Sequence, residues 1–144
     1  MIYTPLTKKA MKLSFEGHKD QVDKTGMPYV FHPFHLAEQM KDEYTTVVAL
    51  LHDIVEDTDM TLEGLCDLGF PKEIIDAIRL MTHAPEVSYM DYVRAIGKNP
   101  IARAVKLADL AHNSDLSRMD EVDEYAKRRT EKYKEAIRIL TEEF

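Results

Sequence analysis

The sequence contains one cysteine, five glycines and no long uninterrupted apolar run. The lone Cys66 excludes an internal disulfide framework and a thiolate metal cluster, so a bound metal would need imidazole and carboxylate ligands. No apolar stretch reaches the roughly eighteen residues that a membrane span requires. The N-terminal residues also lack the apolar core and cleavage site of a signal peptide. We therefore expect a soluble, cytoplasmic protein without a membrane partner.

The charge balance limits the partners. The chain has 144 residues, of which 44% are hydrophobic, and a formal net charge of −7. This size fits one domain with a real core. A strongly acidic balance argues against nucleic acid, whose partners usually present a basic face. A small anionic substrate remains compatible with the sequence if a local group of cations forms its pocket.

Helical periodicity recurs along the whole chain, without repeats, low-complexity tracts or an internal linker. The predicted helices begin at candidate caps or first-turn prolines, which are Thr7, Pro33, Thr61, Pro71, Ser88 and Asn99-Pro100. The β-branched residues of the segment TTVVALLHDIVEDT would also suit a strand, but its length and apolar spacing favour one buried helix. No segment alternates clearly between apolar and polar residues, so the predicted class is all-α.

Polar residues gather at the end of that apolar segment. His52 and Asp53 are adjacent, and Glu56 and Asp57 follow them at a spacing of four. On a helix this spacing places side chains on one face. Because polar groups among apolar residues need partners, the pattern indicates a site, although a solvated helix end with capping carboxylates would give the same letters.

Two further segments favour the site. His32 lies in the proline-bracketed PYVFHP, and Asp109 lies in the apolar helix AVKLADLAHN, where an unpaired carboxylate would be costly. Two imidazoles and two carboxylates are a reasonable ligand set for one divalent ion, with water molecules in the remaining coordination positions.

Three segments in this order, GHKDQVDKTGMPYVFHP, VVALLHDIVEDT and AVKLADLAHN, resemble the hallmark segments of the HD-domain phosphohydrolases. The resemblance is to the RelA/SpoT-type alarmone hydrolases in their small single-domain form, and it covers residues from about 10 to 118. It implies a compact all-α bundle over residues 1–144, with a motif-bearing core at about 5–118 and an amphipathic final helix at about 122–143.

The same resemblance implies roles for individual residues. The implied metal ligands, with manganese the usual ion, are His32, His52, Asp53 and Asp109. Glu56 and Asp57 match the acidic pair that works on the attacking water. Asn113 and Lys24 match residues that contact the nucleotide or its phosphates. The implied activity is removal of the 3′-pyrophosphate of ppGpp and pppGpp.

Two positions depart from the family pattern. Asp23 stands where the family has arginine, and Leu110 where it usually has arginine or lysine. Each change removes a positive charge, so substrate recognition is the property most affected. The Asp23 carboxylate would either accept hydrogen bonds from a guanine edge or point to solvent. An HD phosphohydrolase for another nucleotide or phosphate ester, and a non-catalytic binding module, therefore stay open, as does the oligomeric state.

The remaining histidines and cations have plainer interpretations. His18, His35, His83 and His112 could tune the site, but a partly buried hydrogen-bonding role is the more common one for a lone histidine, and we expect it above all for His35 and His83. A positive pocket could draw on Lys98, Arg103, Lys106 and Arg118. In the final helix, Lys127, Arg128 and Arg129 are predicted to form a solvated charged face.

Overall fold

Nine α-helices and one 3₁₀ turn follow one another in the computed structural model, which describes residues 1–144. Their bounds are α1 (Pro5–His18), α2 (Phe31–Glu38), α3 (Glu43–Leu51), α4 (Ile54–Asp57), α5 (Leu62–Asp67), α6 (Lys72–Met81), α7 (Tyr89–Gly97), α8 (Pro100–Asn113), η1 (Leu116–Arg118) and α9 (Glu124–Glu142). Extended backbone pairs at a single bridge between Val22 and Pro28. The predicted all-α class is confirmed.

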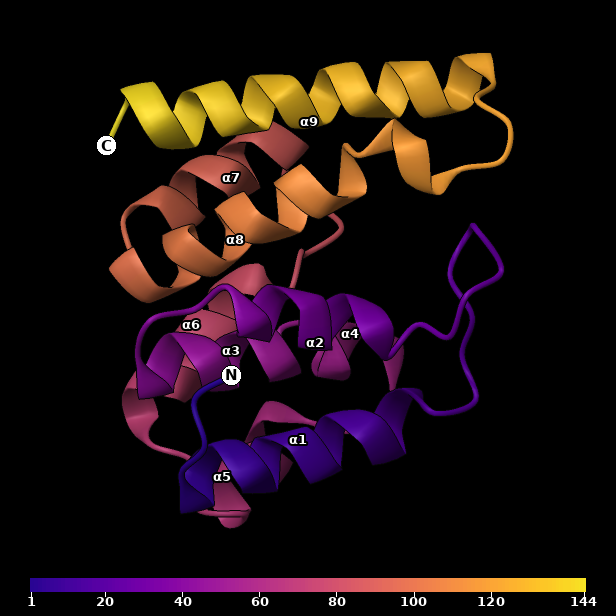
Figure 1. Cartoon of the computed structure of the whole chain (residues 1–144). Helices are drawn as coiled ribbons and strands as arrows, with labels where there is room; N and C mark the ends of the chain where they lie inside the picture. Colours follow the sequence, from indigo (N-terminus) through magenta and orange to yellow (C-terminus); the bar gives the residue numbers. More distant parts are fainter.

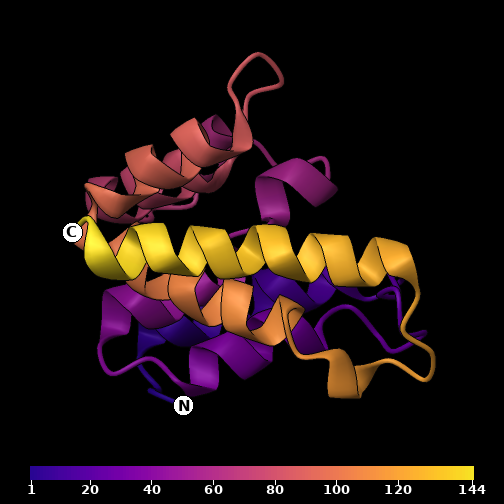
Figure 2. The same cartoon turned by 90° about the horizontal axis from the view of Figure 1, so that it is seen from above.

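Helix α3 occupies the centre and packs against α1, α2, α6 and α8. Figure 1 shows α9 lying across α7 and α8, with α1 and α5 at the opposite side of the molecule and the other helices between them. In both Figure 1 and Figure 2, the loop between α1 and α2 lies at the same end of the molecule as the segment that joins α8 to α9. None of the helices combines the length and the apolarity needed to cross a bilayer.

The hydrophobic core explains why α3 is central. All of its residues from Thr45 to Leu51 are buried, and Val47 through Leu51 have no exposed surface. One apolar cluster joins them to residues from every other long helix, including Ala136, Ile139 and Leu140 of α9. Because α3 is enclosed on all sides, the residues that follow it, His52 and Asp53, are delivered into the middle of the bundle.

Three of the six predicted helix starts are confirmed, and the other three are shifted by one to three residues. Thr61, Ser88 and Asn99 each accept a hydrogen bond from a backbone N–H of the following turn, as N-caps do. The predicted cap at Thr7 is wrong: Thr4 caps α1, and Thr7 is the buried third residue that completes a capping box.

Two prolines also lie differently from their predicted places. Pro33 was expected to begin its helix, but α2 begins at Phe31 and Pro33 is its third residue. Backbone N–H groups in the first turn of a helix have no partner within the helix, so the missing N–H of the proline costs no helical hydrogen bond there. Pro71 is the N-cap of α6 rather than its first residue.

The segment predicted as one buried helix is divided in two. Helix α3 ends at Leu51, and α4 begins at Ile54, so His52 and Asp53 stand between the two helices. The expectation that Glu56 and Asp57 continue the face of an unbroken helix is therefore wrong. Apolar spacing could not reveal the break, because Ile54 beyond it is as deeply buried as the residues before it.

We expect the α3 core to dominate stability. Replacing Leu50, which is 0% exposed, by alanine leaves a cavity and should cost about 2–5 kcal/mol of unfolding free energy. Leu68, which is 40% exposed, is the matched control and should cost less than about 1 kcal/mol on the same change. Urea denaturation of both variants measures the difference. Equal losses would contradict a core centred on α3.

Candidate metal centre and adjoining cleft

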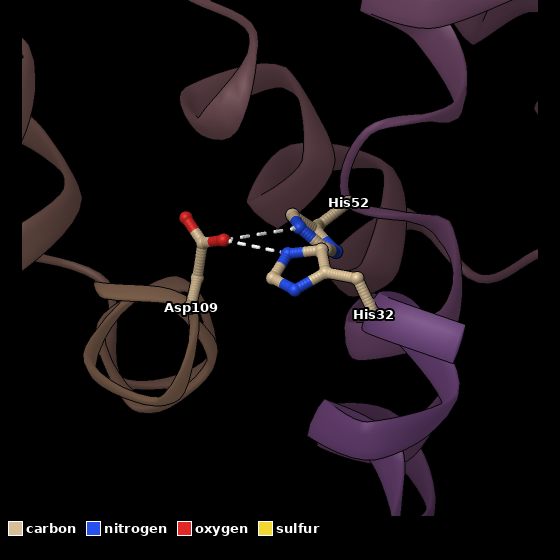
Figure 3. Close-up of side chains that lie close together, drawn as sticks. All are labelled: His32, His52 and Asp109. Carbon is tan, nitrogen blue, oxygen red and sulfur yellow. Dashed lines mark hydrogen bonds and ion pairs between the residues drawn. The ribbon is translucent and has the colours of Figure 1, made fainter. Parts of the chain in front are cut away.

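Three buried side chains from three helices meet at one point. His32 comes from α2, His52 follows the last residue of α3, and Asp109 comes from α8. One ligand atom from each lies within 4.8 Å of the others, and Figure 3 shows both imidazoles facing the same carboxylate. His32 Nε2 is 2.9 Å and His52 Nε2 is 3.6 Å from Asp109 Oδ1. Imidazole nitrogens and a carboxylate oxygen arranged in this way are suitable ligands for a divalent ion.

The orientation of His52 shows that the group needs a positive charge. Its Nδ1 lies 2.7 Å from the carbonyl oxygen of Ala49, which only accepts, so Nδ1 carries a hydrogen. Its Nε2 is buried and has no hydrogen-bond partner, yet it lies 3.0 Å from Asp53 Oδ2. In the neutral ring a nitrogen lone pair therefore faces carboxylate oxygens. Burial lowers the pKa of His52, but Asp53 and Asp109 outweigh it and raise that pKa well above the usual value. Either a proton or a metal ion at this position satisfies all three groups.

Asp109 is kept ionised by its neighbours. Burial would raise its pKa, but Lys106 and the two histidines hold that pKa well below the usual range. Lys106 donates to Oδ2 at 2.9 Å, and Asn113 donates to Oδ1 at 3.0 Å. Both residues lie on α8 within one turn of Asp109, so a single helix fixes the carboxylate and turns Oδ1 toward the histidines.

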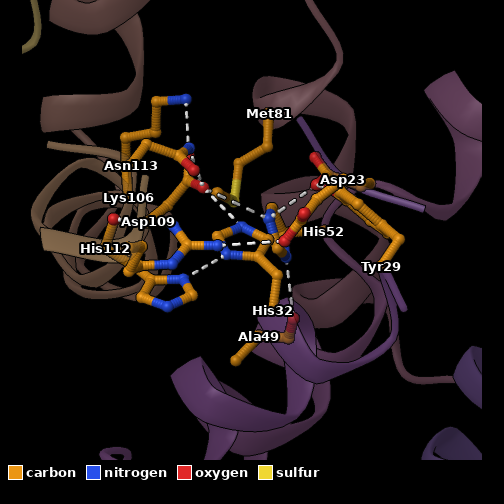
Figure 4. Close-up of polar contacts among 12 residues, drawn as sticks. Asp23, Tyr29, His32, Ala49, His52, Met81, Lys106, Asp109, His112 and Asn113 are labelled. Atoms are coloured by element: carbon orange, nitrogen blue, oxygen red, sulfur yellow. Dashed lines mark hydrogen bonds and ion pairs between the residues drawn. The ribbon is translucent and has the colours of Figure 1, made fainter. Parts of the chain in front are cut away.

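Asp53 lies beside this group rather than within it. Its Oδ2 accepts a hydrogen bond from the Tyr29 hydroxyl and lies 3.0 Å from His52 Nε2. Figure 4 shows Tyr29 and His52 with the other polar contacts around the centre. The structure thus gathers three of the four predicted ligands, and Asp53 contacts the same imidazole nitrogen of His52 that lies 3.6 Å from Asp109. Burial would raise the pKa of Asp53, whereas His52 lowers it, so this carboxylate is ionised.

The predicted acidic pair is separated by its contacts. Asp57 lines the cleft next to the centre, and burial, followed by Asp53 and Glu56, raises its pKa to about 6. Glu56 does not line this cleft, and its carboxylate accepts a hydrogen bond from the backbone N–H of His83. Asp57 is therefore the better placed of the two to act on a molecule in the cleft.

The cleft has a volume of about 580 Å³ and opens beside the centre. Its walls come from the α1–α2 loop, from the end of α4, from the end of α8 with the following turn, and from α9. It contains the predicted substrate residues Asp23, Lys24 and Asn113. The remaining lining residues are Gln21, Val22, Thr25, Tyr29, Asp57, Asp115, Arg118, Met119, Arg129 and Tyr133.

Asp23 follows neither of its two expected orientations. Its Oδ1 accepts hydrogen bonds from Thr25 and Met27 that hold the loop, and its Oδ2 lies 3.2 Å from Arg118 in an ion pair. Burial would raise the pKa of Asp23, but these hydrogen bonds and Arg118 lower it. The carboxylate is thus used inside the protein. Arg118, the last residue of η1, brings a guanidinium group to the side chain at position 23.

The sequence interpretation missed two residues of α9 and misjudged one of α8. Arg129, expected on a solvated face, lines the cleft together with Tyr133, and their spacing of four was the available signal. Leu110 is completely buried in the core and does not line the cleft. Its departure from the family pattern therefore removes no charge from the cleft wall.

The other histidines are hydrogen-bonded, as expected, except that His35 only packs against His112, with ring centroids 4.2 Å apart. His18 Nδ1 contacts Gln21, His83 Nε2 contacts the carbonyl of Val87, and His112 contacts His32. Among the candidate cations, Arg118 lines the cleft, whereas Lys106 is buried against Asp109.

Comparison with known proteins finds relatives of this chain in sequence and in fold. No protein-family model matches the chain. It is 31% identical over 117 residues to guanosine-3′,5′-bis(diphosphate) 3′-pyrophosphohydrolase of Aquifex aeolicus, and 34% identical over 123 residues to the enzyme of that name in Spiroplasma citri. These matches cover 73% of this chain, but only 17% and 16% of the respective relatives.

A structural comparison extends the likeness over the whole chain. The solved structure of a metazoan SpoT orthologue, described as hydrolysing ppGpp, has a TM-score of 0.76 and 22% sequence identity. The match covers 99% of this chain and 88% of that chain. At this identity it shows that the two proteins share their helical fold.

We expect the native chain to bind one divalent ion, and His52→Ala or Asp109→Ala to lose it. The remaining ligands cannot hold the geometry alone, so affinity should fall at least about tenfold. His83→Ala, which alters a hydrogen-bonded histidine outside the group, is the control. Elemental analysis and calorimetric titration with Mn²⁺ measure the effect. Unchanged metal binding in both ligand variants would contradict the site.

Proposed function

This chain is related in sequence and fold to the RelA/SpoT-type alarmone enzymes and has their HD-domain fold, and from this premise we propose that it is a metal-dependent phosphohydrolase that removes the 3′-pyrophosphate of ppGpp and pppGpp. The chain spans about one sixth of the curated relatives it matches, 15% and 17% of the first two. Because only this part of the longer proteins is homologous to the chain, their activity supports the proposal without establishing it.

The observation that carries the proposal is the junction of two features. The buried group of His32, His52 and Asp109 requires a central positive charge, and a cleft lined by cations opens directly beside it. Lys24 and Arg129 both face the ring of Tyr125, at 5.1 and 5.6 Å, and neither forms an ion pair. Unpaired cations next to a metal centre are suited to a phosphorylated substrate.

Each group has a defined task in this reaction. A divalent ion held by His32, His52 and Asp109, with Asp53 beside them, would lower the pKa of a water and stabilise charge on the attacked phosphate. Manganese is the ion that the family resemblance implies. Asp57, whose pKa of about 6 suits a base near neutral pH, takes the proton of the water. The water oxygen bonds to phosphorus while the bond from phosphorus to the ribose 3′ oxygen breaks, and this oxygen takes up a proton from solvent, which leaves a 3′-hydroxyl and pyrophosphate.

The cleft walls position the substrate. Lys24 from the α1–α2 loop and Arg129 from α9 both line the cleft and would neutralise phosphate oxygens, so they favour a substrate with several phosphates over a monophosphate. Asn113 donates a hydrogen bond to Asp109 at 3.0 Å, which connects the cleft wall directly to the metal group.

The expectation of a cytoplasmic location remains a prediction.

One observation favours the second candidate, a phosphohydrolase for another nucleotide. The Asp23 carboxylate in the cleft wall is paired with Arg118, so the loop presents no free cation at position 23 to a base. A panel of ppGpp, the corresponding adenosine compound and 3′- and 5′-phosphorylated nucleotides distinguishes the two. Release of pyrophosphate from ppGpp with the highest kcat/KM supports the proposal. If ppGpp is not cleaved and another phosphate ester is cleaved well, the proposed substrate is wrong and that ester takes its place.

Removing the proposed proton acceptor should stop turnover without releasing the metal. Asp57→Asn keeps the shape of the side chain but loses its basicity, so kcat should fall about a hundredfold or more. Glu56→Gln should also lower kcat, because the charge of Glu56 no longer helps to raise the pKa of Asp57 and Asp57 becomes a weaker base. Mn²⁺ titration of both variants should give native affinity. A near-native rate in Asp57→Asn with metal bound would contradict this role.

The α9 contribution is tested with two neighbouring arginines. Arg129→Met removes a cation from the cleft and should raise the KM for ppGpp about tenfold or more, since each lost charge-assisted contact to phosphate costs on the order of 1.5–3 kcal/mol. Arg128→Met, at an exposed position outside the cleft lining, should leave KM unchanged. The same shift in both variants would show a general charge effect instead of a specific contact.

A further inference from the structure

The ligand histidine His32 is connected to a second histidine on its far side. His32 Nδ1 lies 2.7 Å from His112 Nδ1, while His32 Nε2 faces Asp109 Oδ1 at 2.9 Å. The two ring planes differ by 8°, and their centroids are 5.0 Å apart. Stacked rings would keep their atoms at least about 3.5 Å apart. The rings therefore meet edge to edge in nearly one plane, as a hydrogen bond between the two nitrogens requires (Figure 4).

Only one proton fits between these two nitrogens. If His112 donates it, neutral His32 carries its own hydrogen on Nε2 and points it at Asp109. If His32 donates it, the lone pair of His32 is on Nε2, in the direction of the centre. A metal ion at the centre accepts only the second arrangement, because a nitrogen that bears hydrogen cannot be a ligand.

The surroundings offer no other acceptor to His32 Nδ1. His32 is 4% exposed, and the ring nitrogen of His112 is the only hydrogen-bond partner of its Nδ1. His112 lies on α8, three residues after Asp109, and Arg118 donates to its carbonyl oxygen at 2.9 Å. The acceptor and the carboxylate ligand are thus fixed by the same helix.

We propose that His112 is a positioning residue for the metal centre: its Nδ1 accepts the hydrogen of His32 Nδ1 and so fixes the ring orientation and the tautomer in which His32 Nε2 binds the ion. This inference rests on the metal site of the proposed function and not on its substrate. Hydrogen-bond partners of ligand histidines typically contribute about 10- to 100-fold to metal affinity. We expect a loss in this range when the partner His112 is removed.

Asparagine and glutamine at position 112 separate positioning from bulk. An asparagine oxygen reaches the place of the imidazole Nδ1, whereas a glutamine oxygen reaches the place of Nε2. Affinity for Mn²⁺ without substrate is measured by calorimetry, and the absorption spectrum of bound Co²⁺ reports the ligand geometry. We expect His112→Ala and His112→Gln to lose about 10- to 100-fold in affinity and to alter the Co²⁺ spectrum, and His112→Asn to stay near native.

His35→Ala is the matched control, because His35 packs on His112 at 4.2 Å between centroids but has no hydrogen bond to His32. It should bind Mn²⁺ like the native chain. Native affinity in His112→Ala, or equal affinities in the asparagine and glutamine variants, would overturn the proposal. If the native chain binds no divalent ion, this inference and the proposed function both fail. Normal metal behaviour with inert ppGpp overturns only the proposed substrate.

Discussion

The ionised carboxylate of Asp109, buried where α2, α3 and α8 meet, is the constraint on which the structure depends. A charge in this position is costly unless it is paired and hydrogen-bonded on every side. Lys106 holds one oxygen, and two histidines with Asn113 surround the other. The remaining imidazole nitrogen of His52 has no hydrogen-bond partner until a positive charge is added. The centre of the bundle therefore needs a positive charge, which a proton on His52 or a bound metal ion would supply.

Each residue of this centre could be predicted from its own segment of the chain. The apolar spacing indicated the helices, and His32, the His52-Asp53 pair and Asp109 stood out because polar residues interrupted apolar segments. The break between α3 and α4 could not be predicted in this way. The contact of His52 with Ala49 is local, but Asp53 at the break accepts a hydrogen bond from Tyr29, which lies far away in the sequence, and that contact exists only in the folded chain.

The cleft was harder to predict, because it joins segments that are far apart in sequence. Asp23 and Arg118 are 95 residues apart, and no local pattern signals their ion pair. Arg129 and Tyr133 belong to a helix whose alternation of charges is typical of a solvated surface. Only the packing of α9 across α8, seen in Figure 2, brings them to the cleft. These two residues of the cleft wall could therefore be identified only from the folded chain, whereas each residue of the metal group was marked in its own segment.

The most direct test of the central claim is anomalous X-ray diffraction from crystals of the chain grown with Mn²⁺. The account predicts one anomalous peak per chain at bonding distance from His32 Nε2, His52 Nε2 and Asp109 Oδ1, with Asp53 adjacent. It also predicts that the direct contacts between the two imidazoles and Asp109 lengthen as the ion comes between them. A protein that binds manganese elsewhere, with His52 still paired directly to the carboxylates, would contradict the account.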